Sequence, residues 1–107
     1  MDSNPVDRRI EPRFNVEAFA RLKIASKRRS LPARITNVSD HGIGLRVPFA
    51  LYTAGEAVRI RVRRQAIWGT LKYSYAMGPD IVAGVELKRK LSDEQAKAVL
   101  HEFVATL

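Results

Sequence analysis

Three arginines near the beginning of the sequence are spaced so that they could bind one anion together. Arg9 and Arg13 stand four residues apart, and Arg8 adds a third guanidinium. Pro12 disfavours helix at the residue before it, so we expect an extended or turned chain here. A guanidinium presents paired donors that match a phosphate or the O6/N7 edge of guanine. The segment is predicted to bind such a group; a basic tail without a specific role is the alternative.

A second polar cluster follows in the middle of the chain. Asn37, Ser39 and Gly42 place an amide, a hydroxyl and a glycine within six residues, in a stretch typical of a turn. Amide and hydroxyl groups bond a ligand as readily as the local backbone, and glycine permits a close approach. The pattern indicates either a polar subsite or an ordinary turn between strands.

Catalytic and metal-binding patterns are missing from the sequence. Cysteine is absent, and the two histidines, His41 and His101, stand sixty positions apart. Acidic pairs at metal-ligand spacing are not found, Ser39 has no nucleophile elbow around it, and no phosphate-binding glycine loop appears. The chain is therefore predicted to be no enzyme and to need neither a metal nor a cofactor.

The elements that must position these residues are mostly strands. Residues 1–14 read as a flexible N-terminal arm, and residues 15–107 as one domain. Alternating apolar residues predict six strands, with Asn37 on the inward face of the second. From Ser92 the period becomes helical, and Ser92 with Gln95 has the spacing of a capping box. We predict a mainly β fold, a six-stranded antiparallel barrel with a C-terminal α-helix across one opening. The expected strands are 17–24, 33–37, 43–47, 58–63, 66–75 and 81–87, and the helix is 92–107.

The charge balance indicates anionic partners. Nineteen Lys and Arg against eleven Asp and Glu give a formal net charge of +8. Arg59, Arg61 and Arg63 alternate along one expected strand and form either a solvated face or a surface for an acidic protein or nucleic-acid phosphates. Trp68 is expected to pack half-buried or to stack on a base. The sequence begins without a secretion signal and has no apolar run of membrane-spanning length, so a cytoplasmic protein is expected.

Both polar clusters together resemble a known family. Arg9-x-x-x-Arg13, followed twenty-four residues later by Asn37-x-Ser39-x-x-Gly42, is similar to the two-part signature of PilZ domains, bacterial receptors of cyclic di-GMP. The segments 42–45, 66–68 and 83–87 are similar to later strands of that family. The resemblance implies the same barrel and helix.

The resemblance also implies roles for single residues. Arg9 and Arg13 would contact guanine edges and phosphates, Asn37 and Ser39 would bond the guanine or its phosphate, and Gly42 would leave room for it. Arg8, directly before the first motif arginine, would favour an intercalated pair of ligand molecules, and Trp68 would lie near the site.

The expected function is a non-enzymatic receptor that binds cyclic di-GMP. It would relay the signal to a separate protein by a conformational change, with the arm folding onto the barrel when the ligand binds. Two alternatives remain open: a barrel that binds RNA or single-stranded DNA, and a PilZ-like adaptor that works without a nucleotide.

Overall fold

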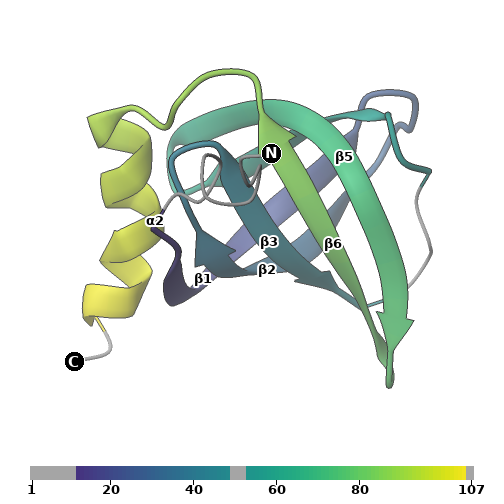
Figure 1. Ribbon diagram of the computed structural model, residues 1–107, viewed down its shortest axis with the longest axis horizontal. Helices are drawn as coiled ribbons and strands as arrows, with labels where there is room; N and C mark the ends of the chain where they lie inside the picture. Colours follow the sequence, from purple (N-terminus) through teal and green to yellow (C-terminus); the bar gives the residue numbers. More distant parts are fainter. Residues whose placement is uncertain (1–11, 49–52, 106–107) are drawn as a thin grey trace, which may run out of the picture.

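A closed six-stranded barrel followed by one helix makes up the described part of the chain (Figure 1). The computed structural model describes residues 12–48 and 53–105, the side chains of 101–105 excepted. Every strand pairing is antiparallel, and β1 pairs with both β2 and β4, which closes the ring in the order β1-β2-β3-β6-β5-β4. The predicted architecture is confirmed. Its elements are β1 (Phe14–Ile24), β2 (Ser30–Val38), β3 (Gly42–Val47), β4 (Ala57–Val62), β5 (Gln65–Met77), β6 (Asp80–Leu87) and α2 (Asp93–Ala105).

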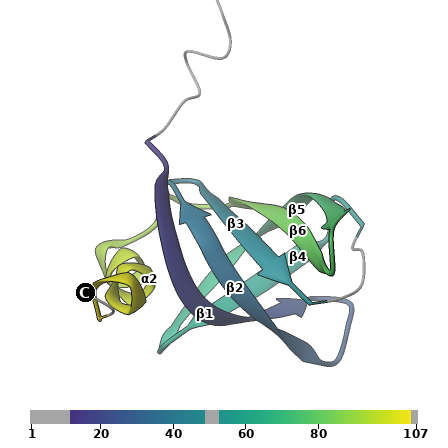
Figure 2. The same cartoon turned by 90° about the horizontal axis from the view of Figure 1, so that it is seen from below.

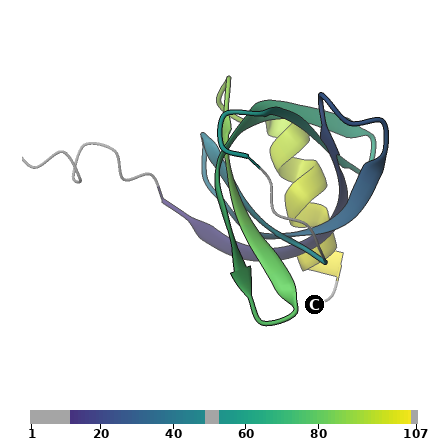
Figure 3. The same ribbon diagram turned by 90° about the vertical axis from the view of Figure 1, so that its right-hand side faces the viewer.

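Apolar side chains from all six strands fill the interior of the barrel. Seen along its axis, the barrel is a ring with the helix behind it (Figure 3). The alternation in β1 and β4 holds as predicted, with every second residue buried. Each large aliphatic side chain buried in this way contributes about 1.5–3 kcal/mol relative to exposure. The fully buried side chains include Leu22, Ile35, Leu45, Ile60 and Leu71.

Helix α2 lies across one opening of the barrel, where Ala98 and Val99 join the core. The predicted capping box is confirmed: Ser92 N donates to Gln95 Oε1 at 3.0 Å, and Gln95 N donates to Ser92 Oγ at 3.1 Å. Gln95 Nε2 also donates to the carbonyl oxygen of Ala66 at 3.1 Å, which ties the helix start to β5. No helix within the described ranges is long and apolar enough to cross a membrane.

Most element boundaries differ from the sequence prediction by one to three residues, and the differences in β1 and β4 affect residues considered for function. β1 begins at Phe14, ahead of the apolar alternation, because Phe14 and Asn15 pair with the end of β2 while their side chains stay exposed. β4 ends at Val62, which pairs with Gln65, so Arg63 lies in a tight turn with a φ of 53°. The arginine alternation along β4 therefore has two members on the strand, Arg59 and Arg61.

Candidate functional site

Strand pairing brings the two polar motifs of the sequence together. Arg13 directly precedes β1, and Asn37 lies near the end of β2; the pairing of Asn15 with Asn37 places them at the same end of the barrel wall. Arg13 Nη1 donates a hydrogen bond to Asn37 Oδ1. Figure 2 shows β1, β2 and β3 side by side on this wall. Arg13 of the first motif therefore meets Asn37 of the second motif in the folded chain.

The turn between β2 and β3 completes the cluster. Ser39 is 6% exposed, and its N–H donates to the carbonyl oxygen of Gly42 at 2.9 Å. A methyl group placed on Gly42 would lie 2.8 Å from Arg13 Nη2 and 3.1 Å from Ser39 Oγ. Glycine at this position thus leaves the space that the Arg13 guanidinium occupies. Arg13, Asn37, Ser39 and Gly42 form one group.

The sequence-based placement of Asn37 on the inward face is wrong. Ile35 and Val38 are both buried, and the β2–β3 register shifts between Ile35 and Asn37. Such a β-bulge adds a residue to one strand and re-aims the side chains that follow it. Asn37 is therefore turned outward to Arg13, while Val38 takes the inward position.

A second bulge turns an aromatic side chain onto the same wall. Leu71 is buried, the β5–β6 register shifts between Leu71 and Tyr73, and Tyr73 is 50% exposed. Its ring covers Gly84, where any Cβ would overlap it. It also stacks on Tyr75, with ring centroids 6.1 Å apart and planes at 20°. The pattern of residues around Tyr73 does not predict a site residue at this position.

Asn37 and Tyr73 stand on one row of paired residues across four strands. Asn37 pairs with Gly44, Gly44 with Gly84, and Gly84 with Tyr73. A Cβ on Gly44 would overlap the Asn37 amide, so this glycine makes room for its neighbour as well. The Asn37 amide therefore lies over Gly44, and the Tyr73 ring lies over Gly84.

Charges around the site are compensated except at Arg13. Arg34 pairs with Glu17 at 3.1 Å, Arg46 with Asp80 at 3.5 Å, Lys72 with Glu86 at 3.2 Å and Lys90 with Asp40 at 3.8 Å. Arg13 instead bonds a neutral amide, and no carboxylate of the described residues is its ion-pair partner. Among the described residues, the positive charge of Arg13 is therefore not paired with a negative one. Within the same residues no cluster of His, Cys, Asp and Glu could hold a metal ion.

The remaining candidates lie elsewhere. Arg8 and Arg9 fall outside the described residues. Trp68 faces outward from β5, pairs with Arg59 of β4 and has the Arg59 guanidinium carbon 5.7 Å from its ring centroid. The pairing of β5 with β6 begins only at Gly69, so Trp68 lies beyond the part of β5 that pairs with β6. The structure brings Trp68 to a basic part of the wall and not to the Arg13 cluster.

Comparison with known proteins gives this arrangement a family. The family model of the PilZ domain matches residues 7–105, which include both motifs. The chain belongs to the PilZ domain family. PilZ domains are receptor domains for cyclic di-GMP and are in general not catalytic.

A solved structure supports the PilZ fold. The chain is similar to the Bacillus subtilis inhibitor of motility (MotI/DgrA), with a TM-score of 0.65 and 13% identity. The match covers 92% of this chain and 51% of that one, so this chain spans about half the length of its structural neighbour. A search of curated protein sequences found no match.

Proposed function

We propose that this PilZ domain is a receptor that binds cyclic di-GMP on the outer wall formed by the start of β1, the end of β2 and β3. The observation that supports this most directly is the Arg13 guanidinium held on Asn37 above Gly42. Arg8 and Arg9, on the segment that leads into Arg13, would supply the other cations.

The ligand's chemistry fits the groups on this wall. Cyclic di-GMP carries two phosphates and two guanine bases, and an arginine can bond either a phosphate or the O6/N7 edge of guanine. Asn37 and Ser39 offer an amide and a hydroxyl beside Arg13. A purine could stack on the exposed face of the Tyr73 ring, which covers Gly84. Each charge-assisted hydrogen bond would contribute about 1.5–3 kcal/mol.

The signal would leave through the turn that follows Ser39. The carbonyl oxygens of Asp40 and His41 accept hydrogen bonds from Leu91 N and Leu87 N, both at 2.9 Å. A ligand that contacts Ser39 and Gly42 would therefore shift, through these hydrogen bonds, the segment between β6 and α2. We propose that a shift of this segment is what a separate partner protein recognises.

Titration calorimetry with cyclic di-GMP tests the receptor function. The wild type is compared with Arg9→Ala/Arg13→Ala and with the control Arg28→Ala/Arg29→Ala, whose residues are exposed in the β1–β2 turn. We expect binding by the wild type and the control and a loss of at least about tenfold in the motif variant. No heat from the wild type at roughly tens of micromolar ligand would refute the proposal. Salt-sensitive binding of an oligonucleotide in its place would favour a nucleic-acid-binding barrel.

A further inference from the structure

A second hollow lies on the side of the barrel formed by β4, β5 and the segment after β6. Ile67 and Gly69 contribute to its apolar floor, and Trp68 forms one side. Trp68 is 57% exposed, and it is the single tryptophan of the chain. The opposite side consists of basic residues from the segment that leads to α2, Lys88, Arg89 and Lys90. We call this the Trp68 hollow.

Four more cations adjoin the hollow on β1 and β4. Arg21 pairs with Arg61, and Lys23 pairs with Arg59, so like charges stand directly opposite one another on neighbouring strands. Such cross-strand pairs destabilise a sheet. An anionic partner lying over these four residues, the basic stripe, would relieve the repulsion.

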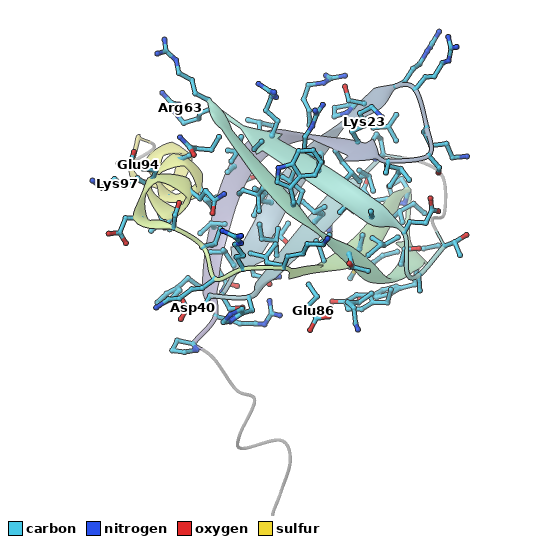
Figure 4. All side chains as sticks on the ribbon, turned by 90° about the horizontal axis from the view of Figure 1, so that it is seen from above. Lys23, Asp40, Arg63, Glu86, Glu94 and Lys97 are labelled. Atoms are coloured by element: carbon cyan, nitrogen blue, oxygen red, sulfur yellow. The ribbon has the colours of Figure 1, made fainter. Side chains whose placement is uncertain are left out.

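Within the part of the chain that the structure describes, carboxylates do not neutralise the basic stripe. Arg21 donates to the hydroxyl and the carbonyl oxygen of Ser30, both at 3.1 Å, and Lys23 donates to the carbonyl oxygen of Lys27 at 2.5 Å. No salt bridge between described residues involves a member of the stripe, whereas Arg34, Arg46, Lys72 and Lys90 all have acidic partners. Figure 4 shows Lys23 on the side of the molecule away from Asp40 and Glu86. The stripe therefore keeps its charge.

The Trp68 hollow and the Arg13 cluster share one segment of the backbone. On one side of this segment, Lys88 N donates to the carbonyl oxygen of Trp68 at 3.4 Å. On the other, Leu91 N donates to the carbonyl oxygen of Asp40, and Lys90 Nζ lies 3.8 Å from Asp40 Oδ2. A movement of the turn after Ser39 would thus change the wall of the hollow.

We propose that the Trp68 hollow and the basic stripe dock an acidic segment of a partner protein. An apolar side chain of that segment would enter the hollow beside Trp68, and its carboxylates would face Arg59, Arg61 and Arg89. Exposed tryptophan and arginine are the residues that most often dominate binding at protein interfaces. This inference rests on the proposed function, because it gives the chemistry of the partner to which the receptor would signal.

The shape of the surface favours a protein segment over other anions. Proteins that bind single strands use successive aromatic platforms on which bases stack. Trp68 is the one aromatic residue among the described residues that line the hollow. A membrane-binding face would present several protruding apolar side chains, whereas Val58 and Ile67, which line this hollow with Trp68, are buried.

The test uses the emission of Trp68 and a synthetic probe. The probe is a short peptide in which glutamate alternates with leucine; its control has glutamine in place of glutamate. We expect the acidic peptide to shift the emission in a saturable way that weakens as salt is added, and the glutamine peptide to have no effect. The double substitution Arg61→Glu/Arg89→Glu should lower the affinity for the acidic peptide by at least about tenfold. Arg28→Glu/Lys97→Glu carries the same charge change outside the hollow and the stripe, and it should change the affinity by less than about twofold.

Three results would overturn the docking proposal. The first is that the acidic peptide leaves the emission of Trp68 unchanged. The second is that the two double variants lose affinity for the acidic peptide to the same extent. The third is tighter binding, sensitive to Arg61→Glu/Arg89→Glu, of oligodeoxythymidine or of anionic phosphatidylserine vesicles, which would assign the surface to nucleic acid or to membrane. Calorimetry with cyclic di-GMP on the same samples keeps the two proposals apart. If the protein binds the peptide but releases no heat with cyclic di-GMP, only the receptor function is refuted. If it binds cyclic di-GMP but not the peptide, only the docking surface is refuted.

Discussion

Arg13 donates a hydrogen bond to Asn37 although the two residues stand 24 positions apart in the chain. The contact follows from the pairing of β1 with β2, which carries Phe14 next to Val38. An arginine at the edge of the barrel is thus already oriented by a neutral partner, with its charge available. Part of the ordering that ligand binding requires is then present in the fold itself, which favours affinity.

Replacing Arg13 should weaken nucleotide binding even where the positive charge is kept. We expect Arg13→Ala to cost at least about tenfold in the Kd for cyclic di-GMP. Arg13→Lys should recover only part of this, because an ammonium cannot present the planar fork that matches a phosphate or a guanine edge. Calorimetry measures both variants. Full recovery by lysine would show that charge alone matters at this position.

Gly42→Ala should impair binding without harming the fold. The added methyl would lie 2.8 Å from Arg13 Nη2, which is the far end of a flexible and exposed side chain. The arginine can move away, so we expect the free energy of unfolding to change by no more than about 0.5 kcal/mol. The guanidinium would leave its position above the turn, and the affinity for cyclic di-GMP should fall. Urea unfolding and calorimetry on one preparation separate the two effects, and an unchanged Kd would contradict this reading of Gly42.

Gly69→Ala is the same chemical change with the opposite expected outcome. A methyl there would lie 2.5 Å from the carbonyl oxygen of Glu86 and 2.7 Å from Val85 Cγ1. Backbone of a neighbouring strand cannot give way as a side-chain end can, so overpacking should cost about 1–3 kcal/mol of stability. Urea unfolding provides the measurement, with Gly42→Ala as the matched control. Equal stability of the two variants would mean that β5 and β6 can separate locally.

The fold was predictable because its signals are local. Residues close together in the sequence determine the alternating burial in β1 and β4 and the capping box of Ser92 and Gln95. The structure confirms each of these features. The two bulges are not local, since they depend on how paired strands fit around a closed ring. For that reason the alternation alone predicts Asn37 on the inward face, and it gives no sign that Tyr73, two residues after the buried Leu71, faces outward. The family motif indicated that Asn37 has a role, but periodicity could not show which way it points.

Ser92→Ala should loosen the helix from the barrel. The hydroxyl of Ser92 accepts the hydrogen bond from Gln95 N, and Gln95 in turn bonds the Ala66 carbonyl oxygen on β5. Loss of a cap of this kind costs about 1 kcal/mol. Thermal unfolding followed by circular dichroism should show a lower Tm than for the wild type. Ser26→Ala, which removes an exposed 2.9 Å hydrogen bond to Glu56, is the control and should have a smaller effect.

Tyr73 and Trp68, the two outward aromatic residues considered for the site, should respond differently to the nucleotide. Tyr73 flanks the glycine row beside Asn37, whereas Trp68 faces Arg59 beyond β6. Contact of a base with an aromatic ring contributes about 1–3 kcal/mol, so Tyr73→Ala should weaken cyclic di-GMP binding several-fold or more. Trp68→Leu should leave the Kd within about twofold of the wild type, because Arg13, Asn37 and Ser39 are not among the described residues that line the hollow beside that ring. Calorimetry on both variants decides between the two placements. A larger loss from Trp68→Leu than from Tyr73→Ala would mean that the ligand extends across β6 to the basic side of the barrel, as the family resemblance had implied for Trp68.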